Sequence, residues 1–153
     1  MTSSLHGTYE VPVTLRALTE GTGPSLVMLG GGTTGATGFA SHAADLATEF
    51  RVIRLQTLNV DYGENGKALP SRYSIKLESQ AMSASLDVVA PTERVDIVGH
   101  SFGGLVALDF ALDHQERVRS LVLSEPPAFW VVPGEEFRSS LDMQHMTSLV
   151  RQF

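Results

Sequence analysis

Residues 95–104 read VDIVGHSFGG, an apolar run that ends in a serine with a glycine two positions away on each side. The pattern Gly99-x-Ser101-x-Gly103 is typical of a serine on a sharp turn between a strand and a helix. The apolar run before the motif favours a buried strand, and the small and apolar residues that continue to His114 favour a helix. The sequence therefore predicts that Ser101 stands at the end of a strand and at the start of a helix.

A serine in this position suits nucleophilic catalysis. A helix N-terminus carries unpaired N–H groups and a partial positive charge, so the N–H of Phe102 would stabilise the oxyanion of a tetrahedral intermediate. The alternative is a chance match or a plain tight turn, but the strand before and the helix after are the context that the motif requires. We interpret Ser101 as the nucleophile, and Gly99 and Gly103 as the glycines that permit the turn.

Strands and helices alternate on both sides of the motif. The run at 26–29 is apolar throughout, as a strand buried on both faces would be. Alternation of this kind predicts an α/β fold in which helices cover both faces of a mostly parallel sheet. The predicted strands are 9–17, 26–29, 51–55, 95–98 and 118–123, the predicted helices are 39–50, 75–89 and 103–114, and 59–73 is predicted to be a polar loop.

With these motifs the chain resembles the α/β-hydrolase superfamily from about residue 9 to residue 130. The resemblance implies an oxyanion loop at 30–32, where Gly30 replaces the usual histidine and the N–H of Gly32 is the second oxyanion donor. It implies a core over residues 1–130 and the start of a lid helix over residues 131–153. The implied activity is hydrolysis of ester, lactone or amide-type substrates through an acyl-enzyme, without a cofactor or a metal.

A serine hydrolase also needs an imidazole and a carboxylate. Glu125 follows the strand after the elbow helix, where the related haloalkane dehalogenases carry their acid; the alternative is a solvated loop residue. In this family the histidine comes after the nucleophile and the acid. Downstream of Ser101 the sequence offers only His114, at the end of a predicted helix, and His145, in the predicted lid helix. We therefore expect an N-terminal portion of a hydrolase that is inactive or weakly active by itself.

Two other interpretations compete with a working enzyme. In the first, the chain is a truncated, non-catalytic remnant that binds a ligand or a complementing chain. Alternatively, Gly30 to Gly35 spell G-x-G-x-x-G, the pattern of a dinucleotide-binding loop. That site predicts an acidic residue at the end of the next strand, but Leu55 and Gln56 stand there, and a strand precedes the loop, so this alternative is the less favoured.

The composition of the chain argues against some classes of binding partner. The 153 residues carry a net charge of −6 and no basic cluster, which argues against nucleic acid or an anionic membrane as a partner. The sequence has no cysteine, which excludes disulfides and a cysteine nucleophile. The sequence shows neither a signal peptide nor a membrane span, so we expect a cytoplasmic protein with a small-molecule acyl substrate. The strand at 118–123 would form an unprotected apolar edge, which favours self-association or pairing with a complementing C-terminal chain.

Overall fold

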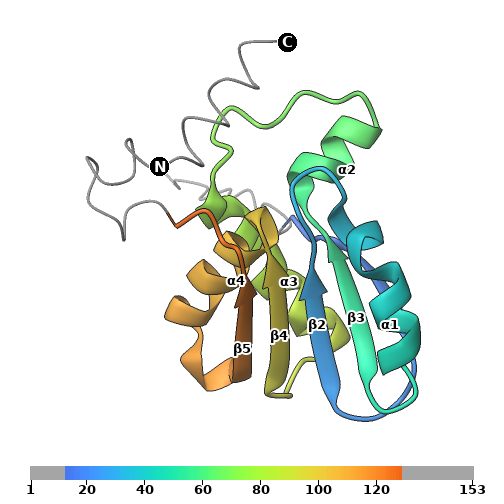
Figure 1. Cartoon of the computed structure of the whole chain (residues 1–153). Helices are drawn as coiled ribbons and strands as arrows, with labels where there is room; N and C mark the ends of the chain where they lie inside the picture. Colours follow the sequence, from blue (N-terminus) through green and yellow to red (C-terminus); the bar gives the residue numbers. More distant parts are fainter. Residues whose placement is uncertain (1–12, 129–153) are drawn as a thin grey trace, which may run out of the picture.

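The computed structural model in Figure 1 describes residues 13–128, which form one five-stranded sheet in the order β1-β3-β2-β4-β5. Strands β2 to β5 are parallel, and β1 runs antiparallel to β3. This confirms the predicted mostly parallel α/β sheet. The strands are β1 (Arg16–Glu20), β2 (Ser25–Leu29), β3 (Arg51–Gln56), β4 (Val95–His100) and β5 (Val118–Ser124). The helices are η1 (Gly35–Phe39), α1 (Ala40–Leu46), α2 (Leu58–Glu64), α3 (Ile75–Val89), α4 (Phe102–Asp113) and η2 (Gln115–Arg117).

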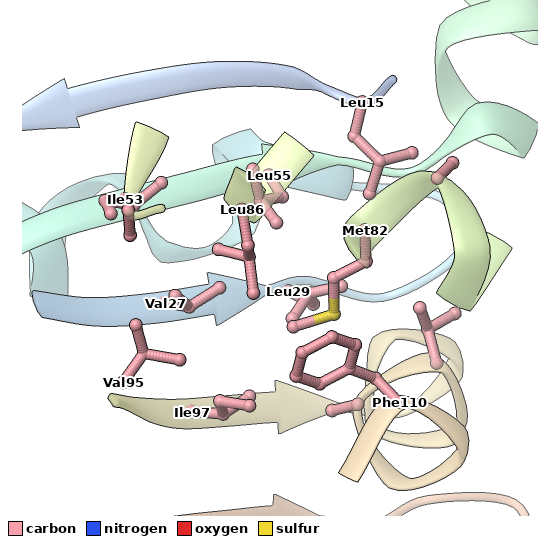
Figure 2. Packing of buried hydrophobic residues seen from close by; sticks show 14 of the residues in the cluster. Leu15, Val27, Leu29, Ile53, Leu55, Met82, Leu86, Val95, Ile97 and Phe110 are labelled. Atoms are coloured by element: carbon pink, nitrogen blue, oxygen red, sulfur yellow. The ribbon is translucent and has the colours of Figure 1, made fainter. Parts of the chain in front are cut away.

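Helices cover both faces of the sheet, and the alternation of side chains along β2 shows how. All five residues of β2 are buried. Val27 and Leu29 belong to the larger core cluster under α3 and α4, where Met82 and Phe110 pack (Figure 2). Leu26 and Met28 pack instead on the other face, against Ala43 of α1. Successive side chains of a strand point to opposite faces, so β2 contributes to both clusters. The continuous apolar run at 26–29 is thus explained by burial on two faces.

The first strand lies later in the chain than predicted. Alternation over residues 9–17 predicted a strand there, but residues 13–15 are not in a strand and residues 9–12 lie outside the described part. The observed β1 pairs from Arg16 opposite Gln56 to Glu20 opposite Val52. The strand that forms is therefore the segment that pairs with β3, and the alternation within residues 9–17 does not reveal that partner.

The predicted polar loop at 59–73 is wrong in its first part, because residues 58–64 form α2. Thr57 is the N-cap of this helix and makes no side-chain hydrogen bond to it. The backbone N–H groups of Leu58 and Asn59 donate instead to the carboxylate of Glu78 in α3, at 2.8 and 3.0 Å. A cap from a distant residue leaves no local signal of the kind that Ser74 provides for α3, where its hydroxyl accepts from the N–H of Leu77.

The remaining boundaries agree with prediction to within a few residues at β2, β3, β4, β5, α3 and α4. The predicted lid at 131–153 lies outside the described residues. Between residues 13 and 128, no helix combines the length and the apolar character needed to cross a membrane.

Candidate active site

Ser101 lies at the junction of β4 and α4, with backbone angles φ 51° and ψ −122°. A positive φ is costly for a residue with a side chain, and such strain concentrates at functional sites. Its N–H donates to the carbonyl of Ser124 at 2.9 Å, and its carbonyl accepts from the N–H of Gly104 at 2.9 Å. The serine therefore sits on a tight, hydrogen-bonded turn whose next residue, Phe102, is the first of a helix and has no helical partner for its N–H.

The two glycines of the motif are required by close packing. A Cβ on Gly99 would lie 2.7 Å from the Cα of Gly104. A Cβ on Gly103 would lie 2.4 Å from the carbonyl oxygen of Gly30 and 2.5 Å from that of Leu29. Because these neighbours are backbone atoms, they have little freedom to move away. The glycines thus let α4 start directly against the end of β2.

The glycine loop after β2 lies against this turn. A Cβ on Gly31 would be 3.7 Å from the Cβ of Ser101, and one on Gly32 would be 3.4 Å from the Cβ of Phe102. The carbonyl of Gly31 accepts from the N–H of Gly35 at 2.8 Å, which closes the loop into a turn. The predicted oxyanion loop and the predicted nucleophile are therefore neighbours, although about 70 residues separate them in the chain.

The residue at the end of β3 holds the same loop. Gln56 is buried, and its Oε1 accepts the backbone N–H of Ala36 at 2.7 Å. A dinucleotide site would need a carboxylate facing a ribose at this point. Here an amide side chain is used to support the backbone that follows the glycines.

Glu125 follows β5 directly and is exposed. Ser124, which precedes it, pairs with His100 in the sheet and accepts the hydrogen bond from Ser101. Glu125 has a φ of 49°. Within residues 13–128, Ser101 and Glu125 are the only residues other than glycine with a positive φ. The two strained backbones therefore stand side by side at the carboxyl edge of the sheet.

The described segment contains three histidines, and His100, whose Nδ1 would lie 3.4 Å from a Cβ on Gly31, is beside the glycine loop. The ring of His100 packs edge-on to Phe39, with centroids 6.5 Å apart. His114 caps the far end of α4, a 12-residue helix and so roughly 18 Å long, and its ring stacks on Phe110. His42 is exposed on α1. None of them is hydrogen-bonded to Ser101, and His145 lies outside the described residues.

Two residues of the site neighbourhood were not singled out from the sequence. Asn59 donates from Nδ2 to the carbonyl of Gly32 at 2.9 Å. Glu78 is fully buried and binds the first turn of the helix that carries Asn59. Neither residue belongs to a motif, and their partners are 19 to 27 positions away. Only the folded chain brings them together.

No group of three or more histidine, cysteine, aspartate or glutamate side chains is placed to hold a metal ion between residues 13 and 128. An apolar groove of about 300 Å³ runs along α3 and α4, and Ser101 does not line it. Its lining residues are Ile75, Leu105, Leu108, Asp109 and Leu112.

The parallel sheet, the glycine loop after β2 and the strained serine between β4 and α4 define an α/β protein of hydrolase type. The chain belongs to the alpha/beta hydrolase fold family, whose model matches residues 24–147. Over 107 residues it is 36% identical to the 2-hydroxymuconate semialdehyde hydrolase of Pseudomonas sp. strain CF600. That match covers 68% of this chain and 37% of the relative, so the chain spans well under half the length of this hydrolase.

Solved structures agree on the fold. An epoxide hydrolase from Bacillus megaterium matches 92% of this chain and 50% of its own, with a TM-score of 0.70 at 14% identity. An esterase from a marine microorganism matches 72% of this chain and 41% of its own, with a TM-score of 0.61 at 21% identity. These likenesses support the architecture. Because the family model covers the glycine loop at residues 30–35, it favours a hydrolase loop over the alternative of a dinucleotide-binding loop.

Proposed function

We propose that this chain carries the nucleophile and the oxyanion site of a serine hydrolase that acts on small ester, lactone or amide-type substrates. The observation that carries the proposal is the backbone of Ser101, strained at φ 51° on the first turn of α4 and facing the glycine loop. Strain of this kind is maintained when it serves a function. The hydrolase names of the relatives support the same class of reaction.

In the proposed mechanism, the hydroxyl of Ser101 attacks the substrate carbonyl carbon and forms a tetrahedral oxyanion. The N–H groups of Phe102 and Gly32 donate to that oxygen. A base takes the Ser101 proton and gives it to the leaving group as the C–O or C–N bond breaks, and water, deprotonated by the same base, then hydrolyses the acyl-enzyme to release the acid and restore the Ser101 hydroxyl. The base is an imidazole that the described histidines do not provide, with His145 as the candidate within this chain.

Glu125 is the proposed acid of the triad. Its place directly after Ser124, whose carbonyl binds the N–H of Ser101, supports this role, as does its positive φ. A carboxylate there would orient the imidazole and stabilise its protonated form. The alternative, a solvated loop residue, is favoured by its exposure.

The exposed edge of the sheet suggests a macromolecular partner as well. In the described sheet β5 pairs only with β4, and Val122 is 55% exposed on it. We propose that this edge binds another strand, from a second copy or from a complementing C-terminal chain. Sedimentation of the purified chain tests the first case, since Val122→Lys should shift a dimer towards monomer.

We also propose a cytoplasmic location for this protein, and cell fractionation tests it.

Labelling with a fluorophosphonate probe, read by intact mass, tests the nucleophile. We expect slow but stoichiometric labelling, because an oxyanion site alone retains about 10³-fold catalysis over water. The label should be lost in Ser101→Ala and kept in Ser41→Ala, a matched control because Ser41 is exposed and its hydroxyl lies 3.5 Å from His42 Nδ1. Equal labelling of wild type and Ser101→Ala would contradict the proposal, whereas a folded wild type without label would support the expectation that the chain is inactive by itself.

A further inference from the structure

The glycine loop is held from two sides around Gly32. On the preceding side, the carbonyl of Gly31 accepts from the N–H groups of Thr34 and Gly35 at 3.2 and 2.8 Å. Because a trans peptide is planar, its N–H points opposite to its carbonyl. The N–H of Gly32 belongs to that peptide, and it is therefore directed away from the turn that Thr34 and Gly35 close.

On the following side, the carbonyl of Gly32 accepts from Asn59 Nδ2 at 2.9 Å. A Cβ on Gly32 would lie 3.3 Å from the same nitrogen and 3.4 Å from the Cβ of Phe102. Asn59 therefore reaches the loop at the residue that faces the elbow. Its other amide atom, Oδ1, is buried and has no hydrogen-bond partner among residues 13–128. Among the described residues, the hydrogen bond of the Asn59 side chain is therefore the one from Nδ2 to the Gly32 carbonyl.

Asn59 is itself held by a buried carboxylate. Glu78 has no exposed surface, and it accepts from the N–H of Leu58, the N–H of Asn59 and the hydroxyl of Tyr73 at 2.8, 3.0 and 2.7 Å. Burial, with the hydrogen bond to Glu78, raises the pKa of the Tyr73 hydroxyl, so it remains a donor. A buried carboxylate with three donors fixes the backbone to which the Asn59 side chain is attached.

We propose that Asn59 is a positioning residue for the oxyanion site, and that Glu78 and Tyr73 hold it in place. This rests on the proposed function, in which Gly32 donates to the oxyanion. Asn59 does not touch the substrate: it sets the orientation of the peptide after Gly32, while the Gly31 carbonyl sets the peptide before it. The N–H of Gly32 then keeps a constant direction towards the space above Ser101.

The test uses three variants of the full chain. Asn59→Asp keeps the shape of the side chain and replaces the donor by an acceptor. Asn65→Asp is the matched control, because Asn65 lies at the other end of α2 and its Nδ2 donates to the carbonyl of Asp61 at 2.7 Å on the exposed surface. Asn59→Gln retains an amide donor and should restore part of the lost effect.

The first readout is independent of activity. The N–H of Thr33 shares a peptide with the Gly32 carbonyl, so its ¹H–¹⁵N resonance reports on the hydrogen bond from Asn59. We expect the Thr33 and Gly32 resonances to move in Asn59→Asp and to stay in Asn65→Asp. Unmoved resonances in a folded Asn59→Asp protein would overturn the inference.

The second readout is the rate of fluorophosphonate labelling at Ser101, separated into probe affinity and maximal rate. Asn59→Asp should lower the maximal rate about tenfold or more at unchanged affinity, since small misplacements at a reacting centre are costly. A change in affinity alone, or an unchanged rate, would overturn the positioning role. If Ser101→Ala retains the label of the wild type, the proposed function fails instead, and the resonances still decide the role of Asn59.

The role of Glu78 has its own measurement. Glu78→Gln should speed hydrogen exchange at the amides of Leu58 and Asn59 by about tenfold, because one of their acceptors is lost. Glu64→Gln, an exposed change in the same helix, should leave both amides unchanged. Equal exchange in wild type and Glu78→Gln would remove Glu78 from the proposal and leave the bond from Asn59 to Gly32 to stand on its own test.

Discussion

The turn after β4 and the turn after β3 lie at the same carboxyl edge of the sheet, and they are stabilised in different ways. After β4, the serine, its glycines and the helix that follows are consecutive residues. After β3, the helix α2 is held at its start by Glu78, from a helix that begins eleven residues after α2 ends. The difference indicates that Ser101, the proposed nucleophile, is positioned by local sequence, whereas the support of the glycine loop comes from tertiary contacts.

The largest expected effect is on the free energy of unfolding when a glycine in each of these two regions is substituted. Gly103→Val adds atoms where the carbonyl oxygens of Gly30 and Leu29 already lie within 2.5 Å of the Cβ position, so we expect a loss of more than about 4 kcal/mol in the free energy of unfolding. Gly63→Ala in α2 meets no atom within 4 Å and should instead stabilise by up to about 1 kcal/mol. Urea unfolding measures both. A mild effect of Gly103→Val would show that the elbow is not tightly packed.

The second prediction concerns the cap of α2. Glu78→Ala leaves two backbone N–H groups and the hydroxyl of Tyr73 without their acceptor, and we expect a loss of about 3 kcal/mol. Glu64→Ala, at the exposed end of α2, should cost less than about 0.5 kcal/mol. If thermal and chemical denaturation gave equal losses for the two variants, the tertiary cap would not stabilise the fold.

A third prediction uses the strained residue beside the elbow. Glu125→Gly removes the side chain from a backbone at φ 49°, which should stabilise the protein by about 1 kcal/mol. If Glu125 is the triad acid and His145 is the base, the same change should slow the labelling of Ser101, because the acid acts through the imidazole. Differential scanning calorimetry and probe labelling measure the two effects on one sample. A variant that is more stable and fully reactive would identify Glu125 as a loop residue without a catalytic role.

The smallest effect is expected at the other end of β4, remote from both turns. The carboxylate of Asp96 binds Arg119 and the hydroxyl of Ser120. Arg119, with a smaller contribution from Ser120, holds the pKa of Asp96 below its ordinary value, although the Arg119 side chain is 43% exposed. A lowered pKa means that this stabilisation is present above the pKa of the unfolded chain and is lost as pH falls through the folded value. We expect Asp96→Asn to cost less than about 1 kcal/mol at pH 7, and the cost should shrink as the pH is lowered and Asp96 becomes protonated, measured by urea unfolding over a series of pH values.

Much of the fold could be predicted because its signals are local. The apolar run at 26–29 predicted a strand buried on both faces, and the glycine spacing around Ser101 predicted a strained turn between a strand and a helix. The prediction failed where the information was distant. Helix α2 was expected to be a loop because its cap comes from Glu78, and β1 was displaced because its register is decided by β3.

The class of the fold, the turn at Ser101 and the need for glycine around it follow from short stretches of sequence, because backbone strain and hydrophobic alternation depend on neighbouring residues. The folded chain adds that Gly31 and Gly32 lie against the elbow, that the carbonyl of Ser124, directly before Glu125, binds the N–H of Ser101, and that Asn59 and Glu78 support the loop. These contacts join residues from separate elements. Packing of the sheet and helices creates them, and no short stretch of sequence specifies them alone.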